Sequence, residues 1–325
     1  MRGEQDNEKI ILMEIHYDKE KLITLRRRLH QYPELSGKEY KTSQTIKQHL
    51  LRHQPDRIIE NLGGTGIAAV YEGKKQGPTV LFRCDLDALP IEEVNTFEYH
   101  SKNQGVAHKC GHDGHMTIMT GLSEAVAAAR PERGRGVLLY QPSEENGQGA
   151  LQVLNDKQFA SIEPDRVFAL HNLPGFPAGS VVLREGTFAA ASKGMINRLY
   201  GKTSHAGEPE NGLSPAMALA DIIRELTLLP TNGTFDDYTL ITVIHARLGE
   251  IAFGTTPGYA EVMATLRTYS NQDMEKLTRK ALEAVGRNAK DHKLRSETDW
   301  TEEFPATVND PESVDLIRQV ARASG

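Results

Sequence analysis

The chain has 325 residues, enough for two domains of ordinary size, and a net charge of −6 that excludes a strongly basic surface. We therefore expect no nucleic-acid partner. No apolar run approaches the roughly 20 residues needed to cross a bilayer, which excludes a membrane-spanning protein. The first ten residues, MRGEQDNEKI, lack the basic-then-apolar order of a signal peptide. These features predict a cytoplasmic protein without a membrane partner.

The first half of the chain alternates between helical and extended patterns. Apolar spacing predicts two helices, two buried strands, a helix and two further strands, at residues 19–31, 36–53, 66–71, 79–86, 114–129, 136–140 and 166–171. The proline of Tyr32-Pro33 separates the first two helices, because it restricts the residue before it. This alternation predicts an α/β layer with a partly parallel sheet.

The order of predicted strands and helices changes at about Gly186. The pattern then predicts strand, helix, strand, strand, helix and strand, at residues 193–200, 213–229, 238–247, 258–269, 271–290 and 293–300. That order is the ferredoxin-like βαββαβ motif. We predict an inserted domain at 186–302 and a first domain made of 1–185 plus 303–325. A helix at Pro311–Ala323 begins the return to the first domain, and we expect further C-terminal parts of that domain to be missing.

Four short segments carry residues suited to chemistry. The densest is His108-Lys109-Cys110-Gly111-His112-Asp113-Gly114-His115, where thiolate and imidazole groups could bind zinc or a similar metal. The others follow apolar strands and read Cys84-Asp85-Leu86-Asp87, Gln141-Pro142-Ser143-Glu144-Glu145 and Ala169-Leu170-His171-Asn172. The rim of a sheet is where α/β proteins place ligands.

Each segment also has a structural interpretation. The first could be a polar loop with Asp113 capping the next helix. Glu144 and Glu145 could form a solvated acidic loop, and His171 could be an edge residue with its hydrogen bonds satisfied. The two cysteines, Cys84 and Cys110, offer at most one disulfide, which a reducing compartment disfavours. Four such segments at the ends of alternating elements are nevertheless hard to dismiss together.

In combination, the motifs resemble the M20 family of metallopeptidases and amidohydrolases, in the branch of aminoacylases, hippurate hydrolases and auxin-conjugate hydrolases. The resemblance covers residues 22–315 and rests on Arg26–His30, Tyr32–Ser36, DLDALPIEE (85–93), HKCGHDGH (108–115), YQPSEE (140–145), ALHN (169–172) and GKTSHAGEP (201–209). It implies an α/β metallopeptidase catalytic domain with an inserted ferredoxin-like dimerisation or lid domain, and a homodimer.

The resemblance also implies roles for single residues. Cys110, His112, Glu145 and His171 match the ligands of a centre with two divalent ions, Mn²⁺ or Zn²⁺, with Co²⁺ or Ni²⁺ as alternatives. Glu144 matches the general base, and Asp87 the acid that supports the metal site. His205, in the inserted domain, matches a histidine that stabilises the oxyanion, often from a partner subunit. Cys84 is then the inert buried cysteine.

The implied activity is hydrolysis of the amide bond of N-acyl amino acids by a metal-activated water. Arg267, in Thr265-Leu266-Arg267-Thr268, fits the family pattern for binding the substrate carboxylate through its bidentate guanidinium, although a surface arginine on a strand would look the same. The acyl group and the amino acid do not follow from the sequence.

Two departures from the family leave an alternative open. A further metal-binding histidine near the family's C-terminus has no counterpart before Gly325, and Gly254-Thr255-Thr256-Pro257 replaces the usual Asn-Val-Ile-Pro. The alternative is a catalytically impaired or non-catalytic binding relative on the same fold. A nucleobase deaminase fits poorly, because its His-x-Glu and Pro-Cys-x-x-Cys pattern is absent.

Overall fold

The computed structural model describes residues 17–232, 235 and 237–324, so the polar start of the chain lies outside it. Within the described residues, no helix is long and apolar enough to cross a membrane. The chain forms two compact units. One takes in the chain up to Val181 together with the residues from Gln319 onward, and the other is Val182–Arg318. Each unit has its own core and is described by itself.

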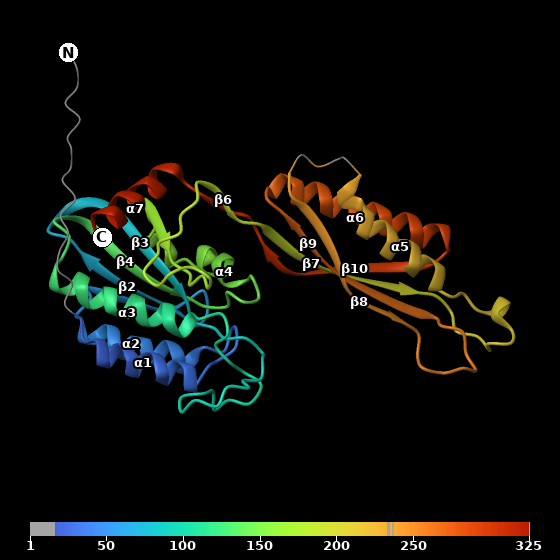
Figure 1. Cartoon of the computed structure of the whole chain (residues 1–325), viewed down its shortest axis with the longest axis horizontal. Coiled ribbons are helices and arrows are strands. Elements are labelled where there is room, and N and C mark those ends of the chain that lie inside the picture. Colours follow the sequence, from blue (N-terminus) through green and yellow to red (C-terminus); the bar gives the residue numbers. More distant parts are fainter. Residues whose placement is uncertain (1–16, 233–234, 236, 325) are drawn as a thin grey trace, which may run out of the picture. The chain divides into compact units, whose positions relative to one another are not determined.

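The first unit is built on a five-stranded mixed sheet (Figure 1). The strands lie in the order β1-β2-β4-β3-β5. The central strand β4 runs parallel to β3 and antiparallel to β2, and β5 runs parallel to β3, so the predicted partly parallel sheet is confirmed. The strands are β1 (Arg57–Leu62), β2 (Gly66–Glu72), β3 (Lys75–Asp85), β4 (Arg133–Gln141) and β5 (Arg166–Ala169).

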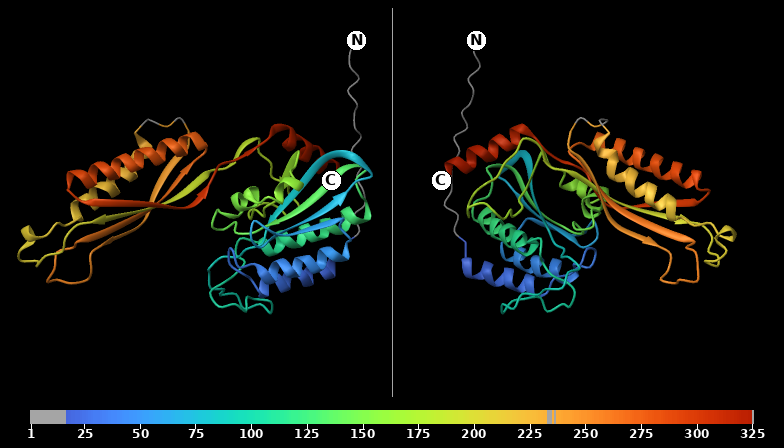
Figure 2. Two further views of the ribbon diagram at one scale, coloured as in Figure 1. Left: turned by 180° about the vertical axis from the view of Figure 1, so that it is seen from behind. Right: turned by 45° about the vertical axis from the view of Figure 1, so that its right-hand side comes forward.

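Three helices cover one face of this sheet, as Figures 1 and 2 show. They are α1 (Lys19–Gln31), α2 (Tyr40–Arg52) and α3 (His112–Ala128). Their apolar side chains pack on Ile67, Ala69 and Tyr71 of β2, while the intervening Ala68 and Val70 belong to the core on the opposite face. This alternation follows from the two-residue period of a strand and explains why β2 is buried on both sides.

The opposite face of the sheet is covered by α4 (Gly149–Asn155) and a short 3₁₀ turn at Phe159–Ser161. Val153 and Ile162 pack there against Leu81 of β3 and Leu139 of β4. The sheet thus has a core on each face, and its strands β3 and β4 end together at one edge. That shared edge carries the motif residues that follow the two strands.

The second unit contains a four-stranded antiparallel sheet in the order β10-β7-β9-β8. Helices α5 and α6 pack on one face of it, with Leu219, Ile222 and Leu277 in the core. The chain order of strands and helices confirms the predicted ferredoxin-like fold. The elements are β7 (Ala191–Tyr200), α5 (Ala216–Leu228), β8 (Thr239–Leu248), β9 (Tyr259–Thr268), α6 (Asn271–Asp291) and β10 (Arg295–Phe304).

Several elements differ from the sequence predictions. The second helix begins at Tyr40 and not at residue 36, and α5 begins at Ala216 and not at 213. Strand β5 ends at Ala169, so His171 follows the strand instead of closing it. The elements without a sequence prediction are β1, α4, the three 3₁₀ turns and the two-stranded pair of β6 (Gly186–Ala189) with β11 (Thr307–Asn309). The predicted helix at Pro311–Ala323 is α7.

Candidate metal centre

Helix α3 begins two residues earlier than the sequence predicted, and this places two histidines in its first turn. Gly111 occupies the N-cap position with φ of 102°, a left-handed conformation that favours glycine. Asp113 is therefore not the cap but a first-turn residue, and its carboxylate accepts hydrogen bonds from Arg26 and His30. His112 and His115 are both fully buried, three residues apart on one side of the helix.

The end of β3 supplies two buried carboxylates. Asp85 is its last residue, and Asp87 is held by the Ser36 hydroxyl, which donates to Oδ2 over 2.7 Å. His112 donates from Nδ1 to the backbone carbonyl of Asp87 over 2.8 Å, while the Asp87 Oδ1 lies 3.6 Å away. The backbone carbonyl, more than the carboxylate, thus fixes the orientation of the imidazole. The other ring nitrogen, Nε2, has no hydrogen-bond partner.

The loop after β4 turns sharply to present two further carboxylates. Ser143 adopts a left-handed φ of 51°, and its N–H donates to the buried Glu39 Oε1 over 2.8 Å. The N–H of Glu145 donates to Asp87 Oδ2 over 2.9 Å. These bonds hold Glu144 and Glu145 at the edge of the sheet beside α3, so the pair is not a freely solvated acidic loop.

Three carboxylates surround the Nε2 atom of His112. Asp85 Oδ2 and Glu144 Oε2 each lie 3.7 Å from it, and Glu145 Oε1 lies 3.8 Å from it. Each of these three distances is too long for a hydrogen bond. Like charges gathered in a buried place are costly unless a cation compensates them. The arrangement therefore suits a divalent cation.

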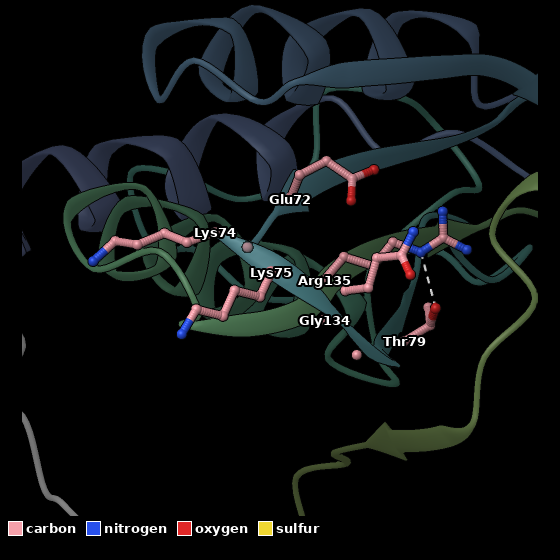
Figure 3. A pocket seen from close by; sticks show the side chains of 9 residues that line it. Glu72, Lys74, Lys75, Thr79, Gly134 and Arg135 are labelled. Carbon is pink, nitrogen blue, oxygen red and sulfur yellow. Dashed lines mark hydrogen bonds between the residues drawn. The ribbon is translucent and has the colours of Figure 1, made fainter.

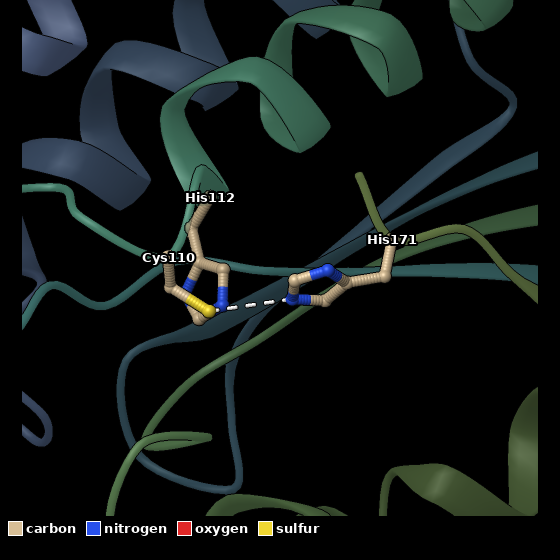
Figure 4. A group of neighbouring side chains, drawn as sticks. All are labelled: Cys110, His112 and His171. Atoms are coloured by element: carbon tan, nitrogen blue, oxygen red, sulfur yellow. Dashed lines mark hydrogen bonds between the residues drawn. The ribbon is translucent and has the colours of Figure 1, made fainter. Parts of the chain in front are cut away.

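Cys110 and His171 meet at the same place from distant parts of the chain, as Figure 4 shows. The Cys110 Sγ lies 3.3 Å from His171 Nε2. The Nδ1 of His171 donates to the carbonyl of Asn172 over 2.8 Å, which turns Nε2 toward the thiol. Asn172 is itself held by His115, whose Nε2 lies 2.7 Å from the Asn172 Oδ1. His171 is thus no isolated edge residue.

Among the residues that the structure describes, donor atoms from seven side chains form three overlapping groups. Within each group the donor atoms all lie within 4.8 Å of one another, and every group contains His112. The groups are Cys110–His112–His171, His112–Glu144–Glu145 and Asp85–His112–His115. The four ligands predicted from the resemblance are therefore brought to one place, together with Glu144 and Asp87. Asp85 and His115 were not among the four predicted ligands, although both lie inside motifs quoted for the resemblance.

The thiol and the two imidazoles shift one another's protonation. The neighbouring imidazoles of His112 and His171 lower the pKa of Cys110 to about 6, which favours the thiolate. The hydrogen bond to Cys110 raises the pKa of His171 to about 9. Burial opposes a charge on His112, but the nearby Asp87 and Cys110 side chains outweigh burial and raise the pKa to about 11. These protons stand where a cation would bind.

The pKa values of the carboxylates shift in different directions. Burial, followed by the nearby Cys110, raises the pKa of Glu145 to about 8. Burial, followed by Asp85, raises the pKa of Glu144. Asp87 differs, because burial is outweighed by the nearby His112 imidazole and the hydrogen bond from Ser36, which lower its pKa. The residues present thus fit a divalent cation, which would replace protons and compensate the clustered negative charge.

The two remaining predicted residues lie in the second unit. His205 is exposed and forms an isolated β-bridge with Thr255, and its Nδ1 accepts from Gly207 N over 3.1 Å. The stretch that departs from the family pattern, residues 254–257, thus lies directly beside His205. Thr256 N donates to Ser204 O over 2.9 Å. Arg267 is exposed on β9, between Ser192 of β7 and Leu240 of β8.

Both cysteines are free, as the sequence predicted, and they differ in character. Cys84 is buried in the helix-covered core, and burial raises the pKa of its thiol well above the usual value, which suits the inert role. A separate pocket lies at the start of β3, away from the metal groups, and is lined by residues 72–77, where β2 leads into β3, with Thr79, Gly134 and Arg135 (Figure 3). Its lining contains no histidine or cysteine.

Sequence comparison identifies the family. The model of peptidase family M20/M25/M40 matches residues 81–325. The chain is 31% identical over 301 residues to the N-acetyl-L-cysteine deacetylase of Bacillus subtilis (strain 168), covering 92% of this chain and 72% of that protein. It is 34% identical over 270 residues to an N-acetyldiaminopimelate deacetylase of Halalkalibacterium halodurans, covering 81% and 71%. The chain belongs to peptidase family M20/M25/M40 and is an enzyme of the amide-hydrolysing kind.

Solved structures agree with this assignment. A dinuclear metal-binding peptidase of the M20 family from Bacillus subtilis superimposes with a TM-score of 0.77 at 26% identity, covering 94% of this chain and 80% of that one. The aminobenzoyl-glutamate utilization protein of Klebsiella pneumoniae shares the fold, with a TM-score of 0.72 at 21% identity and coverage of 92% and 80%. The resemblance and the fold class predicted from the sequence are confirmed.

Proposed function

We propose that this chain hydrolyses the amide bond of N-acyl amino acids, with a centre of two divalent ions. The observation that carries the proposal is the meeting of a thiol, two imidazoles and two adjacent carboxylates around His112. The chain's deacetylase relatives act on N-acetylated amino acids, which supports the same substrate class here. A small molecule with an acyl group and a free carboxylate is therefore the proposed substrate.

Cys110, His112, Glu145 and His171 are the proposed ligands. Thiolate and imidazole favour borderline metals such as Zn²⁺ and Co²⁺, and the carboxylate also suits Mn²⁺. When bound, the ions polarise the amide carbonyl and bring the pKa of a water from about 15.7 to about 7. His112 and His171 each use Nδ1 to donate to a backbone carbonyl, so both present Nε2 as the ligand atom.

Glu144 is the proposed general base. Its carboxylate lies 3.7 Å from His112 Nε2, and its side chain retains 29% exposure, so it can reach a substrate and a water. Burial and the nearby Asp85 raise the pKa of Glu144. The carboxylate therefore binds a proton more readily, as a general base that works near neutral pH requires. Glu144 accepts the proton from the attacking water and delivers it to the leaving amine. Asp87 supports this step by holding His112 and the Glu145 backbone in place.

The second unit is the proposed dimerisation or lid domain, and the first unit the catalytic domain. We propose that His205 stabilises the oxyanion and that Arg267 binds the substrate carboxylate. A partner subunit is the proposed source of His205 for each site. A mixture of Glu144→Ala and His205→Ala chains tests that point, because mixed dimers would regain activity that neither variant has alone. Absence of recovery in a dimer containing both chains would contradict it.

A substrate pair tests the role of Arg267. Arg267→Met should raise the KM for an N-acyl amino acid with a free carboxylate and leave the KM for its carboxamide analogue unchanged, because the bidentate ion pair is lost only in the first case. Arg247→Met is the matched control, since Arg247 lies on β8 and pairs with Glu250. Equal effects on both substrates would remove Arg267 from substrate recognition.

The central test measures release of free amine from a panel of acetyl, benzoyl and indoleacetyl amino acids, including N-acetylcysteine and N-acetyldiaminopimelate. Chelator-treated protein is reloaded separately with Mn²⁺, Zn²⁺, Co²⁺ or Ni²⁺. We expect turnover only in the reloaded samples. Protein that binds metal and releases no amine from any substrate would instead support a non-catalytic binding relative. Turnover that survives complete metal removal would refute the mechanism.

A further inference from the structure

A second set of metal donors lies on the inner side of the candidate centre. Donor atoms of Asp85, His112 and His115 lie within 4.8 Å of one another, and each of the three side chains is at most 2% exposed. Neither Asp85 nor His115 belongs to the ligand set of the proposed function. The group contains a carboxylate and two imidazoles, which is a common donor set for divalent first-row metals.

The local fold explains why these three residues meet. His112 and His115 are three residues apart in the first turn of α3, so their side chains project from the same side of the helix. Asp85 ends β3, which packs beside α3. The ring centroids of His112 and His115 lie 5.5 Å apart. A rigid strand end and a helix terminus therefore hold the donors, without any contribution from a loop.

Each member of the group has an outer partner, and each of the two imidazoles also has a buried ring nitrogen that lacks one. His112 donates from Nδ1 to the Asp87 carbonyl, and His115 uses Nε2 toward Asn172. The ring nitrogens His112 Nε2 and His115 Nδ1 are left without a hydrogen bond, whereas Asp85 Oδ1 forms an ion pair with Arg83. Metal-binding histidines have this arrangement, in which one ring nitrogen is held by a hydrogen bond and the other binds the ion.

A metal-free polar network explains the group less well. The His112 Nε2 and Asp85 Oδ2 are 3.7 Å apart, too far for a hydrogen bond. Donors bound to one ion at about 2.1 Å are separated by roughly 3–4 Å, which agrees with that spacing. Arg83 lies 2.5 Å from Asp85 Oδ1 and compensates one charge, yet the two imidazole nitrogens stay unpaired. Buried unpaired nitrogens are costly unless a ligand satisfies them.

We propose that Asp85, His112 and His115 bind one divalent cation, and that Asp85 and His115 are metal ligands of this enzyme. The inference rests on the proposed function in one respect, because His112 is shared with the proposed centre. His112 offers a single nitrogen, so it binds the inner ion, and Cys110 and His171 remain for the second ion. The inner site lacks a thiolate and so suits harder cations such as Mn²⁺, whereas the Cys110 site prefers Zn²⁺ or Co²⁺.

Cobalt titration separates the two sites. Chelator-treated full-length protein is titrated with Co²⁺, while elemental analysis counts ions per chain and absorption reports the cobalt–thiolate bond of Cys110. We expect His115→Gln and Asp85→Asn to lose one ion, or to bind it at least about tenfold more weakly, with the thiolate band intact. Cys110→Ser should lose the band and keep the inner ion.

His108→Gln is the matched control. His108 is another buried histidine of the same segment, and both of its ring nitrogens lack a hydrogen bond, but it belongs to none of the three donor groups. This variant should bind as many Co²⁺ ions as the parent. Asp85→Asn preserves side-chain volume, so it reports the loss of a ligand even where His115→Gln disturbs packing.

Parental stoichiometry and affinity in Asp85→Asn and in His115→Gln would overturn the inner site. The outcome is independent of turnover. A protein that hydrolyses acyl amino acids but shows no loss of metal in these variants refutes the inference alone. A protein that releases no amine yet loses one ion in each variant supports the inference and refutes the proposed function.

Discussion

The Cys110 thiol and the His171 imidazole lie 3.3 Å apart although 61 residues separate them in the chain. Their meeting depends on two backbone segments, the turn that begins α3 and the segment that follows β5. Gly111 is the point where these segments touch. A Cβ atom at Gly111 would lie 2.3 Å from the Oδ1 of Asn172, the neighbour of His171.

A pair of glycine substitutions tests this close approach. Gly111→Ala should destabilise the protein by roughly 1–3 kcal/mol, since alanine must adopt a φ of 102° and displace Asn172. It should also weaken metal binding, because His171 moves with Asn172. Gly114→Ala is the control, as its Cβ meets nothing within 4 Å and alanine favours the helix by about 0.5–1 kcal/mol. Thermal unfolding and Co²⁺ titration of both variants measure the contrast, and equal behaviour would contradict it.

Replacing the proposed base tests its role without removing metal. Glu144→Gln preserves side-chain size but cannot accept a proton, so kcat should fall by roughly 10²–10⁴. Metal content should stay at the parental value, because Glu145 and not Glu144 is the proposed ligand. Parallel measurement of kcat and of ions per chain decides the matter. A variant that loses an ion together with its activity would make Glu144 a ligand.

Asp87, just after the end of β3, bonds to the segment that contains Ser36 and to the loop after β4 that contains Glu145. Its Oδ2 accepts from the Ser36 hydroxyl and from the Glu145 backbone. Asp87→Asn should weaken metal affinity by about 10–100-fold, because the carboxylate orients the ligand Glu145 through its backbone and places a negative charge 3.6 Å from the ligand His112. Ser36→Ala removes one of the two hydrogen bonds and should have a smaller effect. Competition with a coloured chelator measures both affinities, and unchanged binding in Asp87→Asn would remove its supporting role.

The sequence alone predicted the main elements and the segments of the site. Strong periodicity placed α1, β2 and the ferredoxin-like unit within a few residues, because their apolar spacing is regular. Strand β1, by contrast, reads RIIENL and has no clear alternation, so it was missed. The start of α3 was placed too late, since a left-handed Gly111 at the N-cap leaves no side-chain signal.

The ligand candidates show where sequence reasoning reaches its limit. Cys110 and His112 share one motif, but their proximity to His171 depends on the parallel pairing of β3 with β5. Asp85 and His115 were visible in the sequence as an acid and a histidine near the predicted ligands. Their burial, and the unpaired ring nitrogen of His115, depend on packing against neighbouring elements, which spacing alone does not reveal.

The loop that leads to Cys110 depends on one carboxylate, and its titration gives a prediction for acid stability. The side chain of Glu93 is 2% exposed and accepts from His30, Ser101 and Lys109. Burial opposes its ionisation, but the hydrogen bond from Lys109 and those from its other partners lower the pKa from 4.5 to about 2. Because the folded-state pKa is the lower one, ionised Glu93 stabilises the fold above pH 4.5, and this contribution is lost as pH falls toward 2.

Glu93→Gln should therefore lower the free energy of unfolding at neutral pH by roughly 1–3 kcal/mol, because buried donors lose a charged acceptor. The difference from the parent should shrink between pH 4.5 and pH 2, where the parent also loses its carboxylate charge. Glu92→Gln is the matched control, since the exposed neighbour accepts only from Gly105 among the hydrogen bonds of the described residues. Urea unfolding at a series of pH values measures the free energy of unfolding of the parent and of both variants as a function of pH. A difference between Glu93→Gln and the parent that stays constant down to pH 2 would show that the charge of Glu93 does not stabilise the loop.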